Sequence, residues 1–212
     1  ETAAPVESAE APPPLEGQST GGPQSFSLKT TQVSASFEVS FESTTVEFSS
    51  GQASDPIVLD LDGDGIELTS ALEGILFDLD ADGAAERTAT VTGGDAFLAL
   101  DRNRNGAIDS GSELFGDQNG AANGFLELAK FDSNGDGVID PKDTVFDLLR
   151  VFTGAGAPLS TLLDVGIQSI DLLFRDVSER AQGGNRIAQL GAFSRTDGTR
   201  GLAVDALLNR VV

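Results

Sequence analysis

The sequence predicts an α+β protein, and three patterns along the chain support this fold class. Apolar and polar residues alternate through residues 26–48, which is the pattern of half-buried β-strands. Residues 121–131 and 144–152 carry apolar side chains at helical spacing and flank an Asp-rich loop. Asp197-Gly198 separates two strand-like runs, which predicts a C-terminal β-hairpin. We therefore expect an N-terminal extended β-arm, a loop region with one helix pair, and a C-terminal hairpin.

Composition divides the chain into three parts. Residues 1–24 are rich in Pro, Ala, Glu, Ser and Gly, and they predict an extended arm. Residues 25–54 hold the alternating strands, and residues 55–212 hold the Asp-rich loops with the later strands and helices. The strands of residues 25–54 either pair within their own chain or add to a sheet edge of a neighbour as a donor strand. The sequence leaves both arrangements open.

Charge and composition exclude several classes of function. The chain has 212 residues with 34 acidic against 13 basic side chains, a net charge of −21, and no His, Cys or Met. Imidazole and thiol chemistry are therefore excluded, and the negative charge repels nucleic-acid phosphates. No apolar run approaches the roughly 20 residues of a membrane span. The missing initiator Met fits processing on export, so we expect a secreted, extracellular or cell-surface protein.

The Asp-rich loop of residues 132–143 has the pattern of an EF-hand. Side-chain oxygens occupy loop positions 1, 3, 5, 9 and 12, and Gly occupies position 6. Calcium takes about six to eight oxygen ligands, and this spacing wraps them around one point. The last position carries Asp instead of the usual Glu, which has a longer reach. The predicted ligands are Asp132, Asn134, Asp136, Asp140 and Asp143.

Three further segments repeat this pattern, so we expect several calcium ions. One follows residue 100 and has its Glu at position 13, and the other two place three carboxylates on one turn after an apolar strand. Glu67, Glu86 or the other loop supply the last ligands of those two. The alternative is a set of Asx turns without metal, but carboxylates held so close would repel. The predicted ligands are Asp60, Asp62, Asp64, Asp78, Asp80, Asp82, Asp101, Asn103, Asn105, Asp109 and Glu113.

The ordered motifs resemble the calcium-dependent self-processing module of RTX (repeats-in-toxin) iron-regulated proteins. They are DPIVLDLDGDGIEL from residue 55, LFDLDADG from 76, LDRNRNGAIDSGSELFG from 100 and FDSNGDGVID from 131. The resemblance covers about residues 55–212. It implies that calcium folds the module and triggers cleavage of the Asp-Pro bond at its start, through an anhydride that a lysine amine can capture. The matching bond here is Asp55-Pro56, and the chain offers Lys29, Lys130 and Lys142 as amines.

Two functions therefore compete. The leading hypothesis is a calcium-binding structural subunit: calcium rigidifies the body, and the N-terminal arm mediates head-to-tail homo-oligomer assembly into a filament or surface layer. The alternative is calcium-triggered autocatalytic cleavage at Asp55-Pro56, which would make the protein an enzyme acting on itself. A magnesium phosphatase of the Asp-x-Asp type is disfavoured because the motif recurs three more times.

Overall fold

A computed structural model describes residues 54–154 and 156–211. The predicted arm of residues 1–24 and all but the last residue of the predicted 25–54 strand region lie outside the described residues. The choice between pairing within the chain and donation to a neighbour therefore stays a prediction.

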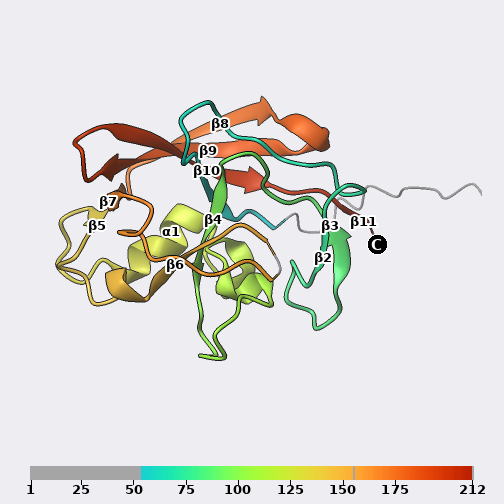
Figure 1. Cartoon of the computed structure of the whole chain (residues 1–212), viewed down its shortest axis with the longest axis horizontal. Coiled ribbons are helices and arrows are strands. Elements are labelled where there is room, and N and C mark those ends of the chain that lie inside the picture. Colours follow the sequence, from blue (N-terminus) through green and yellow to red (C-terminus); the bar gives the residue numbers. More distant parts are fainter. Residues whose placement is uncertain (1–53, 155, 212) are drawn as a thin grey trace, which may run out of the picture. The chain divides into compact units, whose positions relative to one another are not determined.

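The described part of the chain is mostly β-structure, with eleven strands and one short α-helix (Figure 1). The larger sheet is curled and entirely antiparallel, and its strands run in the order β5-β7-β9-β10-β1-β4-β6, with β8 pairing outside this order on β9. The smaller sheet has the order β11-β3-β2. The strands are β1 (Ile57–Leu59), β2 (Ile75–Phe77), β3 (Glu86–Thr88), β4 (Ala96–Leu100), β5 (Val138–Ile139), β6 (Leu149–Phe152), β7 (Ile167–Asp171), β8 (Arg175–Arg180), β9 (Arg186–Arg195), β10 (Arg200–Leu207) and β11 (Arg210–Val211).

The predicted α+β class with an EF-hand helix pair is wrong. The first expected helix shrinks to α1 (Gly124–Leu128) followed by a 3₁₀ turn, and the second is a 3₁₀ turn (Phe146–Leu148) that leads into β6. The apolar spacing of residues 144–152 fits a helix, but β6 pairs with β4 and buries Leu149, Val151 and Phe152. Tertiary pairing therefore overrides the local helical period, as it often does for short apolar runs.

Strand β1 separates two hydrophobic cores. Its side chains alternate between the faces of the sheet, so Ile57 and Leu59 join the core that contains Phe125 of α1. Val58 faces the other way and joins the core that contains Phe77 of the smaller sheet. All three β1 residues are completely buried, which explains why this strand is a continuous apolar run.

The expected C-terminal hairpin is formed by β9 and β10, which pair around Asp197-Gly198. Gly198 has a φ of +86°, and the Thr199 N–H donates to the Asp197 carboxylate at 2.9 Å, so the turn residues suit their positions. β10 also pairs with β1 and places Asp205 opposite Ile57. The hairpin thus brings a residue from near the chain end to the start of β1.

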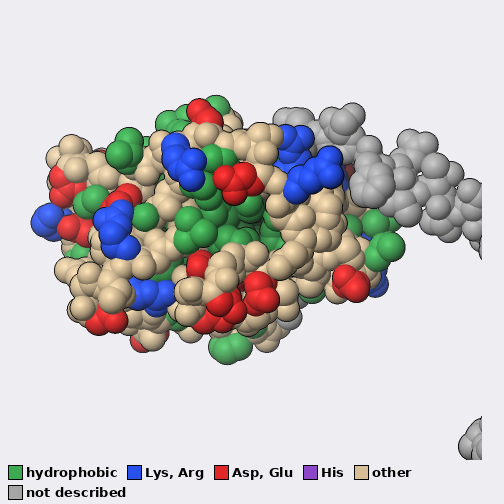
Figure 2. All heavy atoms as spheres, turned by 90° about the horizontal axis from the view of Figure 1, so that it is seen from above, with side chains coloured by type: hydrophobic (Ala, Val, Ile, Leu, Met, Phe, Trp, Pro, Cys, Tyr) green, Lys and Arg blue, Asp and Glu red, His purple; other side chains and the backbone are tan. Residues whose placement is uncertain are grey.

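None of the described helices is long and apolar enough to cross a membrane. On the face seen in Figure 2, acidic and basic side chains are interspersed around a hollow that exposes hydrophobic side chains.

Phe125 tests the core on the α1 side of the sheet. It is fully buried, its ring stacks on Phe174 with centroids 5.4 Å apart, and a Cβ added at Gly191 would stand 2.6 Å from it. We expect Phe125→Ala to lower the free energy of unfolding by about 3–5 kcal/mol in urea titrations, because the ring leaves a cavity. Leu126→Ala, at a 45% exposed neighbour, should cost less than about 1 kcal/mol. Equal losses in the two variants would contradict the packing described here.

Candidate functional site

Each of the four Asp-rich loops folds around the carboxylate of its first Asp. In the loop of residues 101–113, Asp101 accepts the N–H groups of Asn105 at 3.1 Å and Gly106 at 2.9 Å. The corresponding residue of each other loop accepts amides three to five positions further on, and these residues are Asp60, Asp78 and Asp132. At the middle positions of these loops, Asn103, Asn134 and Asp82 lie exposed, whereas Asp80 is half-buried.

The last carboxylates of two loops occupy equivalent places. Asp143 and Glu113 are both buried, at 3% and 2% exposure, and each accepts the N–H groups at loop positions 2 and 9. The donors are Ser133 (2.8 Å) and Asp140 (3.0 Å) for Asp143, and Arg102 (3.0 Å) and Asp109 (3.0 Å) for Glu113. The longer Glu side chain thus compensates for the extra residue in the loop of residues 101–113.

A lysine enters the loop of residues 132–143. The Lys142 ammonium group lies 3.0 Å from Asp136 and 2.9 Å from Asp140, and these two hydrogen bonds raise the pKa of Lys142. The hydrogen bond from Lys142 lowers the pKa of Asp136. Part of the loop's negative charge is therefore neutralised at two of the atoms that the sequence predicts as metal ligands.

Asp60 and Asp62 meet a third carboxylate that the sequence did not reveal. Carboxylate oxygens of Asp60, Asp62 and Asp95 lie within 4.8 Å of one another, whereas Asp64 is not part of this group. Asp95 is 3% exposed; one oxygen accepts the Glu67 N–H at 2.6 Å, and the other has no partner among the described residues. Burial raises the pKa of Asp95 to about 6. The three carboxylates form an oxygen-only donor set that suits a hard cation.

The glycines before Asp95 were the available signal for this group. A Cβ added at Gly94 would stand 2.3 Å from a carboxylate oxygen of Asp62, so only glycine lets the two loops approach so closely. Gly93 has a φ of +62°, a conformation that glycine adopts readily. A Gly-Gly-Asp sequence before a buried strand therefore marked a close contact with another loop.

The second acidic group consists of Asp78, Asp80 and Glu86, again with oxygens within 4.8 Å. Arg210 of β11 pairs with Asp80 and, at 3.1 Å, with Glu86. The loops that begin at residues 60 and 78 therefore gather separate groups of carboxylates. A guanidinium group already neutralises part of the second one.

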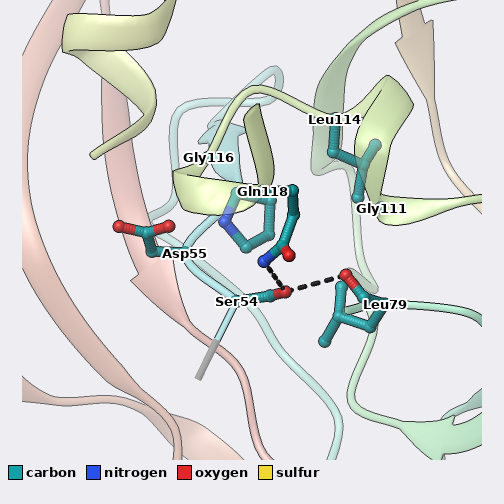
Figure 3. A pocket seen from close by; sticks show the side chains of 8 residues that line it. Ser54, Asp55, Leu79, Gly111, Leu114, Gly116 and Gln118 are labelled. Atoms are coloured by element: carbon teal, nitrogen blue, oxygen red, sulfur yellow. Dashed lines mark hydrogen bonds between the residues drawn. The ribbon is translucent and has the colours of Figure 1, made fainter. Parts of the chain in front are cut away.

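Asp55 and Pro56 lie directly before β1 and line a narrow pocket with Ser54 and Gln118 (Figure 3). Asp55 is 7% exposed, and its carboxylate accepts the Asp117 N–H at 2.7 Å. Burial, and then the neighbouring Asp117 charge, raises the pKa of Asp55 to about 7. The pocket leaves no room for a water molecule, and the Ser54 hydroxyl donates to the Leu79 carbonyl at 2.8 Å across it.

Asp205, which lies opposite Ile57 in the pairing of β10 with β1, is a second buried carboxyl, and the sequence alone did not reveal it. It is completely buried on β10, and one of its oxygens accepts the Gly124 N–H at 2.6 Å. Burial, and then the Asp55 charge, raises the pKa of Asp205 to about 8. The sequence did carry one sign of this buried acid, a single Asp inside the apolar run of residues 202–208, which is unusual for a buried strand.

Comparison with known proteins places these features in a family, because residues 57–209 match the model of the SPM domain. The chain belongs to the SPM domain family. It is also similar to the iron-regulated protein FrpA of Neisseria meningitidis serogroup C, with 42% identity over 169 residues that cover 73% of this chain and 15% of FrpA. The SPM domain chain therefore spans a small part of the length of this relative.

The match to the SPM domain confirms the broad family that the ordered motifs indicated. The dependence on calcium and the EF-hand character of the loops stay predictions. The matched region begins one residue after Pro56.

From the raised pKa of Asp205, we predict how the free energy of unfolding changes with pH. Its folded pKa of about 8 lies above the unfolded value near 4, so its contribution to stability is complete below pH ~4 and is lost as the pH rises through 8. Asp205→Asn removes this titration and keeps an acceptor for Gly124. We expect the free energy of unfolding of wild type to fall relative to the variant by up to about 1.4 kcal/mol per pH unit. Urea titrations at constant calcium would contradict this if the two curves ran parallel.

Proposed function

We propose that this SPM domain binds calcium through its acidic loops and, once loaded, cleaves its own Asp55-Pro56 bond. The placement of Asp55 carries the proposal. Its carboxyl is buried beside its own peptide bond, and a pKa of about 7 leaves a large share of it ionised near neutral pH. Asp-Pro alone is more often a simple turn, but here the family match begins directly after it.

The chemistry requires only groups of this chain. An ionised Asp55 side chain attacks its own carbonyl carbon and closes a five-membered anhydride, while the bond to the Pro56 nitrogen breaks. The Pro56 nitrogen, which belongs to a tertiary amide, leaves as a secondary amine once this nitrogen is protonated. Water then opens the anhydride to two carboxyl groups, or a lysine amine such as Lys130 or Lys142 opens it and forms an amide.

Contacts between the loops and the bond supply a route for calcium control. Asp60 follows β1 directly, so Asp60, Asp62 and Asp95 would hold an ion at the far end of that strand and would fix that end in place. The loop of residues 78–83 contacts the segment of residues 110–118 through a 2.7 Å hydrogen bond from Gly111 N–H to the Asp78 carbonyl.

The same segment contains the last carboxylate of the loop of residues 101–113 and the amide that binds Asp55. Glu113 and Asp117 are separated by only three residues of this segment. Calcium at either neighbouring loop would therefore order the backbone that holds Asp55. We propose that this coupling makes cleavage depend on calcium.

We also propose that the protein works outside the cell. Loops with Asn in place of Asp and with a short last carboxylate suit the weaker binding of extracellular calcium sites, about 10⁻⁴–10⁻³ M. Assembly through the N-terminal arm concerns residues outside the described part of the chain, and it stays a prediction.

Self-cleavage predicts defined fragments. On addition of calcium, the full chain should yield one fragment that ends at Asp55 and one that starts at Pro56, read by intact-mass spectrometry. Asp55→Ala should abolish both fragments because no carboxylate remains to attack. Asp55→Glu should slow their appearance on the order of 10-fold or more, because the ring that must close is larger. Wild type that stays intact with calcium bound would contradict the proposal, and chelation by EDTA is the control.

We predict that Asp95 is a calcium ligand together with Asp60 and Asp62. Asp95→Asn removes one of three carboxylates, so we expect one calcium ion to bind more weakly by about 10- to 100-fold in calorimetric titrations. The other sites should keep their affinity. The matched control is Asp147→Asn, which changes an exposed Asp outside the acidic groups. Unchanged binding in Asp95→Asn would remove Asp95 from the ligand set.

A further inference from the structure

We propose that Asp205 is the acid of the self-cleavage and gives its proton to the Pro56 nitrogen as the amide bond breaks. This inference rests on the proposed function and adds a second residue to it. The attacking group explains how the bond is opened, but the departing nitrogen also needs a proton. Asp205 is a buried carboxyl near Asp55 to which the cleavage chemistry has given no role.

The sheet places Asp205 across from the residue that follows Pro56. It lies opposite Ile57 in the pairing of β1 with β10, and the next residue, Ala206, donates its N–H to the Pro56 carbonyl at 3.1 Å. A Cβ added at Gly124 would stand 2.7 Å from Ile57 and 3.1 Å from the Asp205 carboxylate, so the start of α1 closes over both. The position of the carboxyl is therefore fixed by two strands and a helix.

The hydrogen-bond pattern around Asp205 favours its protonated form. One oxygen binds Gly124, but the other has no partner among the described residues. Gln189, directly opposite on β9, also has a buried side-chain oxygen without a partner in the described part of the chain. Two buried acceptors without donors are unfavourable, and a proton on Asp205 adds the missing donor.

The charges around Asp205 also favour its protonated form. Asp55 and Asp117 both raise the pKa of Asp205, after burial itself, and the nearest acid on α1, Glu127, pairs with Arg102. Asp205 therefore titrates at about 8 and Asp55 at about 7. Between these values, the attacking carboxyl is ionised while the acid keeps its proton. Carboxyl pairs whose environments separate their pKa values commonly divide the roles of acid and nucleophile in this way.

The step balances within the chain. An Asp55 carboxylate oxygen forms a bond to the Asp55 carbonyl carbon, and the bond from that carbon to the Pro56 nitrogen breaks. The electron pair goes to this nitrogen, which takes the proton of Asp205 and leaves Asp205 as a carboxylate. Opening of the anhydride by water then releases a proton, which restores the acid.

The test is Asp205→Asn in the full chain with saturating calcium. Asn keeps an acceptor for the Gly124 N–H but has no acidic proton, so a purely structural role is preserved. We expect the cleavage rate to fall about 100-fold or more, with calcium stoichiometry and circular dichroism unchanged. Wild-type cleavage should rise with pH through about 7 and fall above about 8, and the variant should lose the falling limb. Asp147→Asn is the control at an exposed Asp.

The outcomes separate this inference from the proposed function. Absence of cleavage in calcium-loaded wild type would overturn both. Wild type that cleaves, with an Asp205→Asn variant of equal rate and equal pH profile, would overturn only the role of Asp205. If the variant does not fold, the wild-type profile decides: a falling limb near pH 8 supports the acid, and a rate that stays level above pH 8 overturns it.

Discussion

Burial of β1 on both faces is the constraint on which the candidate site depends. The strand is held between β10 and β4, and its three apolar side chains anchor two cores. Its ends therefore cannot shift independently of the protein interior. Asp55 and Pro56 stand at one end and Asp60 at the other, so the bond proposed to break and the first acidic loop share one rigid element.

Charge repulsion is the second constraint on this molecule. Two groups each gather three carboxylates within 4.8 Å, and Arg210 offsets part of the charge of the group of Asp78, Asp80 and Glu86. Lys142 plays the same part in the loop of residues 132–143. Among the described residues, no basic side chain pairs with the carboxylates of Asp60, Asp62 and Asp95, although the Arg195 guanidinium group donates to the Asp60 backbone carbonyl at 3.1 Å. Unneutralised carboxylates at this spacing favour a bound cation or protonation, and burial makes Asp95 titrate at about 6.

The sequence predicted individual loops better than the elements around them. The Asp-rich motifs of residues 60–65, 78–83, 101–113 and 132–143 form compact loops around their first Asp, because their side chains bind amides only a few residues away. The pair of helices expected beside residues 132–143 does not form. Residues 149–152 instead form a strand that pairs with β4. Local hydrogen bonding can be predicted from spacing, whereas a competition between sheet and helix depends on a distant strand.

The sequence by itself determined the charge, the Asp loops, the β9–β10 hairpin and the family, since each rests on composition or on residues near each other in the chain. Only the tertiary structure decided which carboxylates meet. Asp95 joins the loop that begins at Asp60. Asp205 lies at the start of β1, although it is 150 residues after Asp55 in the chain. Both acids lack a motif of their own. Their chemistry comes from burial and from neighbours that the sheet selects, and neither is visible in local spacing.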